Sequence, residues 1–132
     1  MKKFAYILIL SIIFACQYLY AEANVEQSLK TIRLLDFKEY KNLTLDNIKS
    51  LKIIRYSEAG VNEKDITDIN EITGIYNYMT LIKILDESKM SCTDNTTIYS
   101  FTLKDNTKAS IEIECEWVVI KGKNYNFKTI QK

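Results

Sequence analysis

Cysteines are the side chains of this sequence with the most distinctive chemistry. Cys92 and Cys115 both lie in the C-terminal half, and in an oxidising compartment two such cysteines commonly form a disulfide. A bond between them would close a loop of about 24 residues and stabilise the fold by roughly 3 kcal/mol. The alternative is a pair of free thiols, with Cys115 packed as a small apolar residue on a strand. Both interpretations stay open from the sequence.

A second group that could do chemistry is a series of alternating carboxylates at Glu112, Glu114 and Glu116. Alternation places them together on one face of a strand, where they could bind Ca²⁺ or a basic partner. A charged row also keeps a sheet soluble and discourages edge-to-edge pairing. We favour the second interpretation, because calcium sites normally need loop carbonyls as well. No metal site and no cofactor are therefore expected.

Histidine is absent from the sequence. This removes the usual general base and the nucleophile–histidine pairs of serine and cysteine hydrolases. No other nucleophile and base stand at a spacing that indicates a catalytic pair. We therefore predict no catalytic residues and a protein that is not an enzyme. An enzyme built from tyrosine, lysine and carboxylates is the less favoured alternative.

The first 23 residues have the pattern of a signal peptide. Lys2 and Lys3 precede a 12-residue apolar run at residues 4–15, which is shorter than the roughly 20 residues that span a bilayer. The small residues Ala21 and Ala23 then fit the recognition pattern of signal peptidase. We predict export to the periplasm or the medium, with no membrane span after cleavage.

A competing interpretation of the same segment is a lipoprotein signal. It would end at Ala15, and Cys16 would be lipidated and become the new N-terminus. Ala15 suits such a site, whereas the bulky Phe14 does not. The protein would then be a lipid-anchored component of the cell envelope.

After a signal peptide at residues 1–23, we expect residues 24–47 to form an N-terminal helix or a tether. Residues 48–132 are expected to form one small α+β domain. Removal of the signal peptide leaves 16 basic and 16 acidic residues. A neutral chain without a basic cluster is a poor nucleic-acid binder, because phosphate neutralisation supplies most of that affinity. No nucleic-acid partner is therefore predicted.

The main helix is predicted over about residues 68–86. Apolar side chains recur there at steps of three and four, which is the spacing of one helix face; they are Ile69, Ile72, Tyr76, Met79 and Ile82. Asp68 is the expected N-cap, and Glu71 could reach back to complete a capping box. Gly74 is interpreted as a point of close packing against a strand or of a slight bend in the helix, and Tyr78 falls off the apolar stripe.

The apolar face of the helix must pack against another element, and the strand patterns of the sequence predict a sheet that can do this. Residues 48–56 are predicted to be a strand because they are isoleucine-rich and end before Gly60. Between residues 97 and 127 apolar and polar residues alternate, which indicates an antiparallel meander. The predicted fold is therefore α+β, with one main helix packed on an antiparallel sheet of four to five short strands.

The first hairpin of this meander is expected to turn through a three-residue loop at residues 105–107, with Asn106 in the left-handed conformation. The resulting register pairs Phe101 with Ile111 and Tyr99 with Ile113. It also places Thr97 opposite Cys115, within reach of a chain that folds back to Cys92.

A second hairpin is predicted from the sequence WVVIKGKNY at residues 117–125, with a loop at residues 121–124. Its apolar positions have the opposite parity from those of the preceding strand, so a turn or bulge must lie at residues 114–116. A helix followed by strands and a final hairpin of this kind resembles small exported domains of unknown function from low-GC anaerobic bacteria. The resemblance covers about residues 48–128, and it implies the α+β fold but no activity.

Tyrosines and Trp117 are plentiful enough to build a recognition surface, as such residues do at binding hot spots. Taken together, these patterns predict an exported, non-catalytic binding or interaction module. Its expected partner is a protein, a peptide or a cell-wall component, recognised by a sheet face or a sheet edge.

Overall fold

The computed structural model describes residues 12–13, 16–17, 32–90, 92 and 94–131. The predicted cleavage residues Ala21 and Ala23 lie outside these ranges. Seven strands and one α-helix follow three short 3-10 helices. Their bounds are η1 (Leu34–Asp36), η2 (Lys38–Tyr40), η3 (Leu45–Asn47), β1 (Ile48–Ser57), β2 (Gly60–Ile66), α2 (Ile69–Thr80), β3 (Ile82–Ser88), β4 (Thr96–Leu103), β5 (Lys108–Glu114), β6 (Trp117–Ile120) and β7 (Lys123–Thr129).

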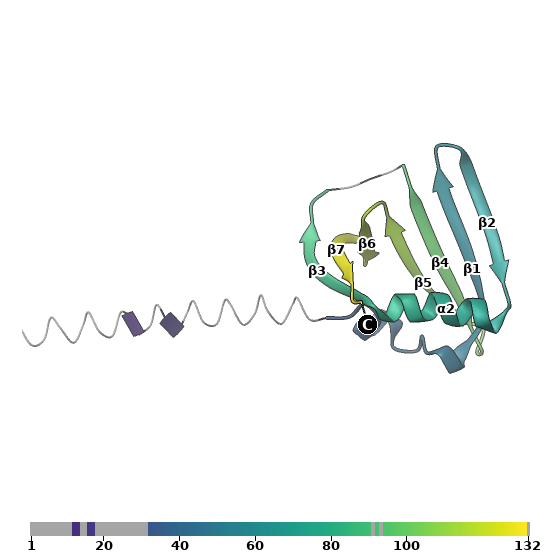
Figure 1. Cartoon of the computed structure of the whole chain (residues 1–132), viewed down its shortest axis with the longest axis horizontal. Helices are drawn as coiled ribbons and strands as arrows, with labels where there is room; N and C mark the ends of the chain where they lie inside the picture. Colours follow the sequence, from purple (N-terminus) through teal and green to yellow (C-terminus); the bar gives the residue numbers. More distant parts are fainter. Residues whose placement is uncertain (1–11, 14–15, 18–31, 91, 93, 132) are drawn as a thin grey trace, which may run out of the picture.

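All seven strands form a single sheet in the order β2-β1-β4-β5-β6-β7-β3, and every neighbouring pair is antiparallel. Helix α2 follows β2 at one edge of the sheet and leads to β3 at the other edge, so it crosses the sheet (Figure 1). The α+β class and the antiparallel sheet agree with the prediction, but the number of strands was underestimated. Strands β2 and β3 had not been recognised.

The helix is shorter than predicted. It begins after Asp68, whose carboxylate accepts a hydrogen bond of 2.8 Å from the backbone N–H of Asn70, so the predicted N-cap is correct. The capping box is not formed, because Glu71 forms an ion pair with Lys64 of β2 instead. The helix ends at Thr80, and the residues that follow form β3.

One face of the sheet, here called the inner face, packs against α2 and the 3-10 segment. Ile72 and Met79 of the helix are 1% and 0% exposed and belong to the same buried cluster as Phe101 and Ile111 of the sheet, both 0% exposed. Odd-numbered residues of β4 and β5 supply this face, as the alternation predicted. Burial of these apolar side chains is the main favourable term in folding.

Residues 32–47 close the lower end of this core. They contain three single-turn 3-10 helices and bury Leu34, Tyr40 and Leu43. The carbonyl of Ile32 accepts a 2.9 Å hydrogen bond from the N–H of Ile84, and Arg33 forms a β-bridge with Lys83. This segment therefore covers part of the outer edge of β3.

The register of the first meander hairpin is shifted by two residues from the prediction. Tyr99 lies opposite Ile111 and Phe101 opposite Ala109. The reason is an earlier turn, since the N–H of Leu103 already bonds the carbonyl of Thr107 at 2.8 Å. The same parity is kept, so the apolar residues still share a face.

Two predicted turns are present. Asn106 has a φ of 66°, the left-handed conformation expected for it. Strands β5 and β6 are separated by a two-residue turn at Cys115 and Glu116, within the predicted range. The last hairpin turns through Lys121 and Gly122 alone, with φ values of 53° and 73°. It is therefore two residues tighter than predicted, because a pair of left-handed residues closes a two-residue hairpin.

In the part of the chain that the structure describes, no helix combines the length and the apolar character that a membrane crossing requires.

Candidate functional site

An open groove of about 530 Å³ lies on the inner face, between the upper parts of β1, β2 and β4 and the first turns of α2. Figure 1 shows that the helix crosses the lower ends of these strands, and that their upper parts extend beyond it. The residues that line the groove are Ile53, Arg55, Tyr56, Ser57, Asn62, Lys64, Glu71, Ile75, Asn95, Thr97 and Tyr99.

The floor of the groove is built by two rows of residues that run across three strands. In the lower row, Ile53 of β1 lies between Lys64 of β2 and Tyr99 of β4. In the upper row, Arg55 lies between Asn62 and Thr97. Directly paired residues in a sheet point to the same face, so the antiparallel registers alone bring these side chains together from three separate parts of the sequence.

Burial decreases from the lower row to the upper row. Ile53 is 8% exposed, whereas Arg55 is exposed and Thr97 is half-buried. Tyr99 is half-buried, and this burial raises the pKa of its phenol, while the nearby positive charge of Arg55 acts in the opposite direction. At neutral pH Ile53 and Tyr99 therefore form an apolar part of this floor that carries a neutral hydroxyl, here called the apolar floor.

Charges around the groove are mostly paired. Lys64 forms an ion pair with Glu71 and so joins β2 to the start of the helix. Lys52, on the opposite face of β1, contacts Glu63 at 3.4 Å and Asp65 at 3.7 Å. Arg55 forms no ion pair with any residue that the structure describes. It is the unpaired charge of the lining.

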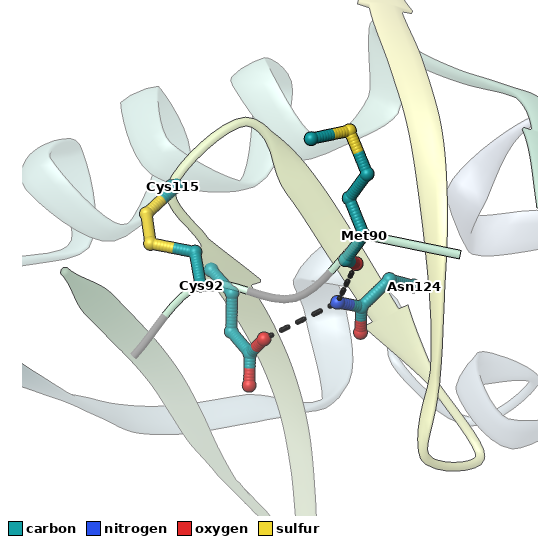
Figure 2. The surroundings of a disulfide bond; sticks show 5 residues. Met90, Cys92, Cys115 and Asn124 are labelled. Carbon is teal, nitrogen blue, oxygen red and sulfur yellow. Dashed lines mark hydrogen bonds between the residues drawn. A yellow bond between two sulfur atoms is a disulfide. The ribbon is translucent and has the colours of Figure 1, made fainter. Parts of the chain in front are cut away.

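The predicted cysteine pair lies beside the groove. Cys92 and Cys115 form a disulfide with their Cα atoms 6.2 Å apart, inside the limit of about 7 Å for such a bond (Figure 2). The N–H of Cys115 donates a 2.8 Å hydrogen bond to the carbonyl of Asn95, a groove residue. The disulfide therefore fixes the chain segment that forms this end of the groove.

The surroundings of Cys115 differ from the expectation in two respects. It is exposed in the β5–β6 turn with a φ of 48°, rather than packed on an apolar strand face. Asn95, and not Thr97, lies across from it, because the register is shifted by two residues from the prediction. On the other side of the segment, the side-chain amide of Asn124 donates to the carbonyl of Met90 at 3.0 Å and to Glu114 at 3.4 Å (Figure 2).

The predicted acidic row is only partly present. Glu112 and Glu114 lie on β5, while Glu116 belongs to the turn. Partial burial and the adjacent Glu114 carboxylate raise the pKa of Glu112. Among the described residues, no group of three or more histidine, cysteine, aspartate or glutamate side chains could hold a metal ion. Cys16, the candidate for lipidation, carries an exposed free thiol.

The sequence had not singled out Arg55, Asn62 or Thr97 as site residues. They stand 7 and 35 residues apart along the chain and match no motif. A usable signal was the turn before Gly60, whose φ of 115° only glycine adopts easily. Recognition of a hairpin there would have paired Arg55 with Asn62.

Comparisons of the chain with models of protein families, with curated proteins and with solved structures gave no match. The geometry and charge of the groove are therefore the basis for assigning a function.

Proposed function

We propose that this protein is an exported, non-catalytic binding module that holds a peptide, protein segment or cell-wall component in the inner-face groove. The observation that carries this proposal is the groove itself. Its volume of about 530 Å³ falls within the range of roughly 300–1,000 Å³ typical of ligand sites. Its mixture of an apolar floor and a polar rim is also the usual composition of such sites.

The lining supports binding rather than catalysis. Lys64 and Glu71 neutralise each other, so neither is poised as a free base or nucleophile. The raised pKa of Tyr99 makes its phenolate scarce at neutral pH. A general base needs a pKa near the working pH and a reacting proton within hydrogen-bond reach. The groove residues therefore offer contacts to a ligand but no evident acid–base pair.

Export is supported by two independent features. Residues 1–23 have the signal-peptide pattern of a charged start, an apolar run and small residues. The disulfide between Cys92 and Cys115 fits an oxidising compartment, since disulfides are rare in the reducing cytosol.

Binding in the groove can be tested with a variant that fills it. Thr97 lies next to Arg55 at the β4 end of the upper row and lines the groove, so Thr97→Trp should occupy the space that a ligand needs. Ser100→Trp is the matched control, because the residue belongs to the same strand but has the opposite parity. Short peptides and soluble cell-wall fragments would be screened by NMR chemical-shift mapping.

A ligand that shifts the amides of residues 53–57 and 95–99, and that is lost in Thr97→Trp but kept in Ser100→Trp, would support the proposal. Hits that map to another surface and survive Thr97→Trp would refute the groove as the binding site.

The cellular location requires a separate experiment. If signal peptidase cleaves the chain, the intact mass should be that of a protein that begins at Asn24 or Glu22. Incorporation of labelled palmitate that disappears in Cys16→Ala would instead show the lipid-anchored form. A full-length chain recovered from the cytosol would contradict export altogether.

A further inference from the structure

We infer that the groove binds the C-terminal residue of a peptide, with the terminal carboxylate on Arg55 and a large apolar side chain over Ile53 and Tyr99. This inference rests on the proposed function and names the class of ligand. It is carried by the position of one unpaired cation next to an apolar floor.

The charge of the lining favours an anion. Three charged residues line the groove, and the ion pair between Lys64 and Glu71 leaves Arg55 as the one of the three without an ion pair to any residue that the structure describes. Guanidinium groups match carboxylates with two parallel hydrogen bonds, which are among the strongest in proteins. An anionic group that entered the groove would therefore find its strongest partner at Arg55.

Neutral polar side chains flank that position. Asn62 and Thr97 lie directly opposite Arg55 on the two neighbouring strands. An amide and a hydroxyl can each donate a hydrogen bond to the carboxylate oxygens or accept one from a peptide N–H. In the register of the sheet, neither acidic side chain of β2, Glu63 or Asp65, lies opposite Arg55; both contact Lys52 instead. Repulsion between these groups and an incoming carboxylate is therefore small.

The apolar part of the ligand has a defined place. Ile53 is two residues before Arg55 on the same strand, about 7 Å away on the same face. Tyr99 lies beside Ile53, and Ile75 approaches from the helix. A terminal residue with a large side chain spans the step from Arg55 to this floor. A small polar residue at the terminus would leave the floor exposed to water.

The alternative anions are an acidic side chain within a peptide and a phosphate group. An internal aspartate continues the peptide on both sides of its residue and so needs room for two chain segments, whereas a chain end needs room for one. A phosphate lacks the apolar group for which the lower row is suited. Both alternatives can be separated from a chain end by the choice of probe.

The test is a set of NMR titrations of the mature chain with its disulfide intact. The probes are N-acetyl-Ala-Ala-Phe as the free acid, the same peptide as the C-terminal amide, N-acetyl-Ala-Asp-Ala-amide and inorganic phosphate. Each probe is titrated into the wild type, Arg55→Gln and Lys128→Gln. The last variant is the charge-matched control, since it removes an exposed positive charge of β7 that does not line the groove.

The free acid should shift the signals of Arg55 and Tyr99. It should bind at least about tenfold more tightly than the amide, because a hydrogen-bonded ion pair is lost with the carboxylate. Arg55→Gln should lose that same factor and no longer distinguish acid from amide, as expected when both changes remove one interaction. Lys128→Gln should bind like the wild type.

Equal binding of acid and amide in the groove would overturn the inference and leave the groove as a binding site. Tighter binding of the aspartate peptide or of phosphate would overturn it in favour of that anion. If none of the four probes moves a groove signal at millimolar concentration, the chain-end ligand is refuted. The proposed function would then depend on the separate screen with Thr97→Trp.

Discussion

The two ends of the inner face of β1, β2 and β4 differ sharply, although the strands run through both without interruption. Near the helix, Ile66, Leu51 and Phe101 form one row across the three strands and are 2%, 1% and 0% exposed. Four residues further along β1, the equivalent row has Arg55 at its centre and lies open. The same sheet therefore supplies a sealed core at one end and a groove at the other.

The length and course of the helix explain this difference. Helix α2 has 12 residues, which corresponds to about 18 Å, and it crosses the sheet on its way from β2 to β3. A helix that runs across strands can cover only one part of their length. The ends that project beyond it need another cover, and among the described residues none is provided over Arg55. The groove therefore follows from the path of the connection between the two edge strands.

The largest effect is expected from a charge placed in the core at the closed end. Met79 is 0% exposed, so Met79→Asp would bury a carboxylate without a partner and should unfold the domain, a loss of several kcal/mol. Far-UV circular dichroism and urea denaturation would measure it. Tyr78→Asp is the control, because the neighbouring Tyr78 is 41% exposed and should tolerate the charge. Native-like melting of Met79→Asp would disprove the sealed core.

Removal of the disulfide should weaken the open end in particular. Cys115→Ser is expected to lower the free energy of unfolding by roughly 2–4 kcal/mol, since the unfolded chain regains the freedom that the bond removes. Hydrogen exchange should accelerate first at Asn95 and Thr97, which the bond holds beside the groove, and less at Phe101. An equal loss of protection at both ends would contradict the distinction between them.

Tyr40, which is buried, and Tyr99, which is half-buried, allow the two ends to be compared by pH. Burial, and to a smaller extent the charges of Glu39 and Glu112, raise the pKa of Tyr40 at the closed end to about 12. An unfolded tyrosine has a pKa of about 10. The folded state therefore keeps a proton that the unfolded state loses, and this stabilisation is complete below pH 10 and is lost as the pH rises to about 12.

Urea midpoints between neutral pH and pH 12 would follow this effect. Tyr40→Phe should flatten the alkaline decline by about 1–2 kcal/mol. Tyr99→Phe should flatten it less, because the positive charge of Arg55 opposes the effect of burial on the pKa of Tyr99. A larger effect of Tyr99→Phe would reverse the assignment of the better sealed end.

The smallest expected effect concerns the helix that covers the closed end. Gly74 is exposed, and a Cβ atom added to it meets no atom within 4 Å, so the predicted close packing against a strand is wrong. Gly74→Ala should therefore stabilise the fold by about 0.5–1 kcal/mol through helix propensity. Gly60→Ala should destabilise it, because Gly60 has a φ of 115°. Thermal denaturation of both variants would compare them, and a loss of stability in Gly74→Ala would reveal a contact that the structure does not contain.

Features that depend on residues close together in the chain could be predicted from the sequence alone. Asp68 caps the helix because a short acidic side chain there can reach the next free N–H groups. The alternation in β4 and β5 selected the odd-numbered residues for the core. The register differs from the prediction by two residues, and a two-residue shift keeps each side chain on the same face. Asn106 took the left-handed position of its turn because asparagine tolerates that conformation.

Only the tertiary structure decided where the helix stops. Ile82 continues the apolar pattern of the helix closely enough to be counted with it, but Ile82 and Ile84 are both buried on β3, at 0% and 3% exposure. The N–H of Ile84 bonds the distant Ile32, and β7 pairs along the other side of β3. These partners lie far away in the sequence, so no local pattern could reveal them.

The groove also depends on contacts between residues that are distant in the sequence. Its floor combines β1, β2 and β4, and Arg55 is flanked by Asn62 and Thr97 only after both neighbouring strands have paired in their registers. The disulfide was compatible with the cysteine count, but its role beside Asn95 depended on a turn that exposes Cys115. Residue types along a chain limit which contacts are favourable, whereas the pairing of distant strands selects the side chains that meet.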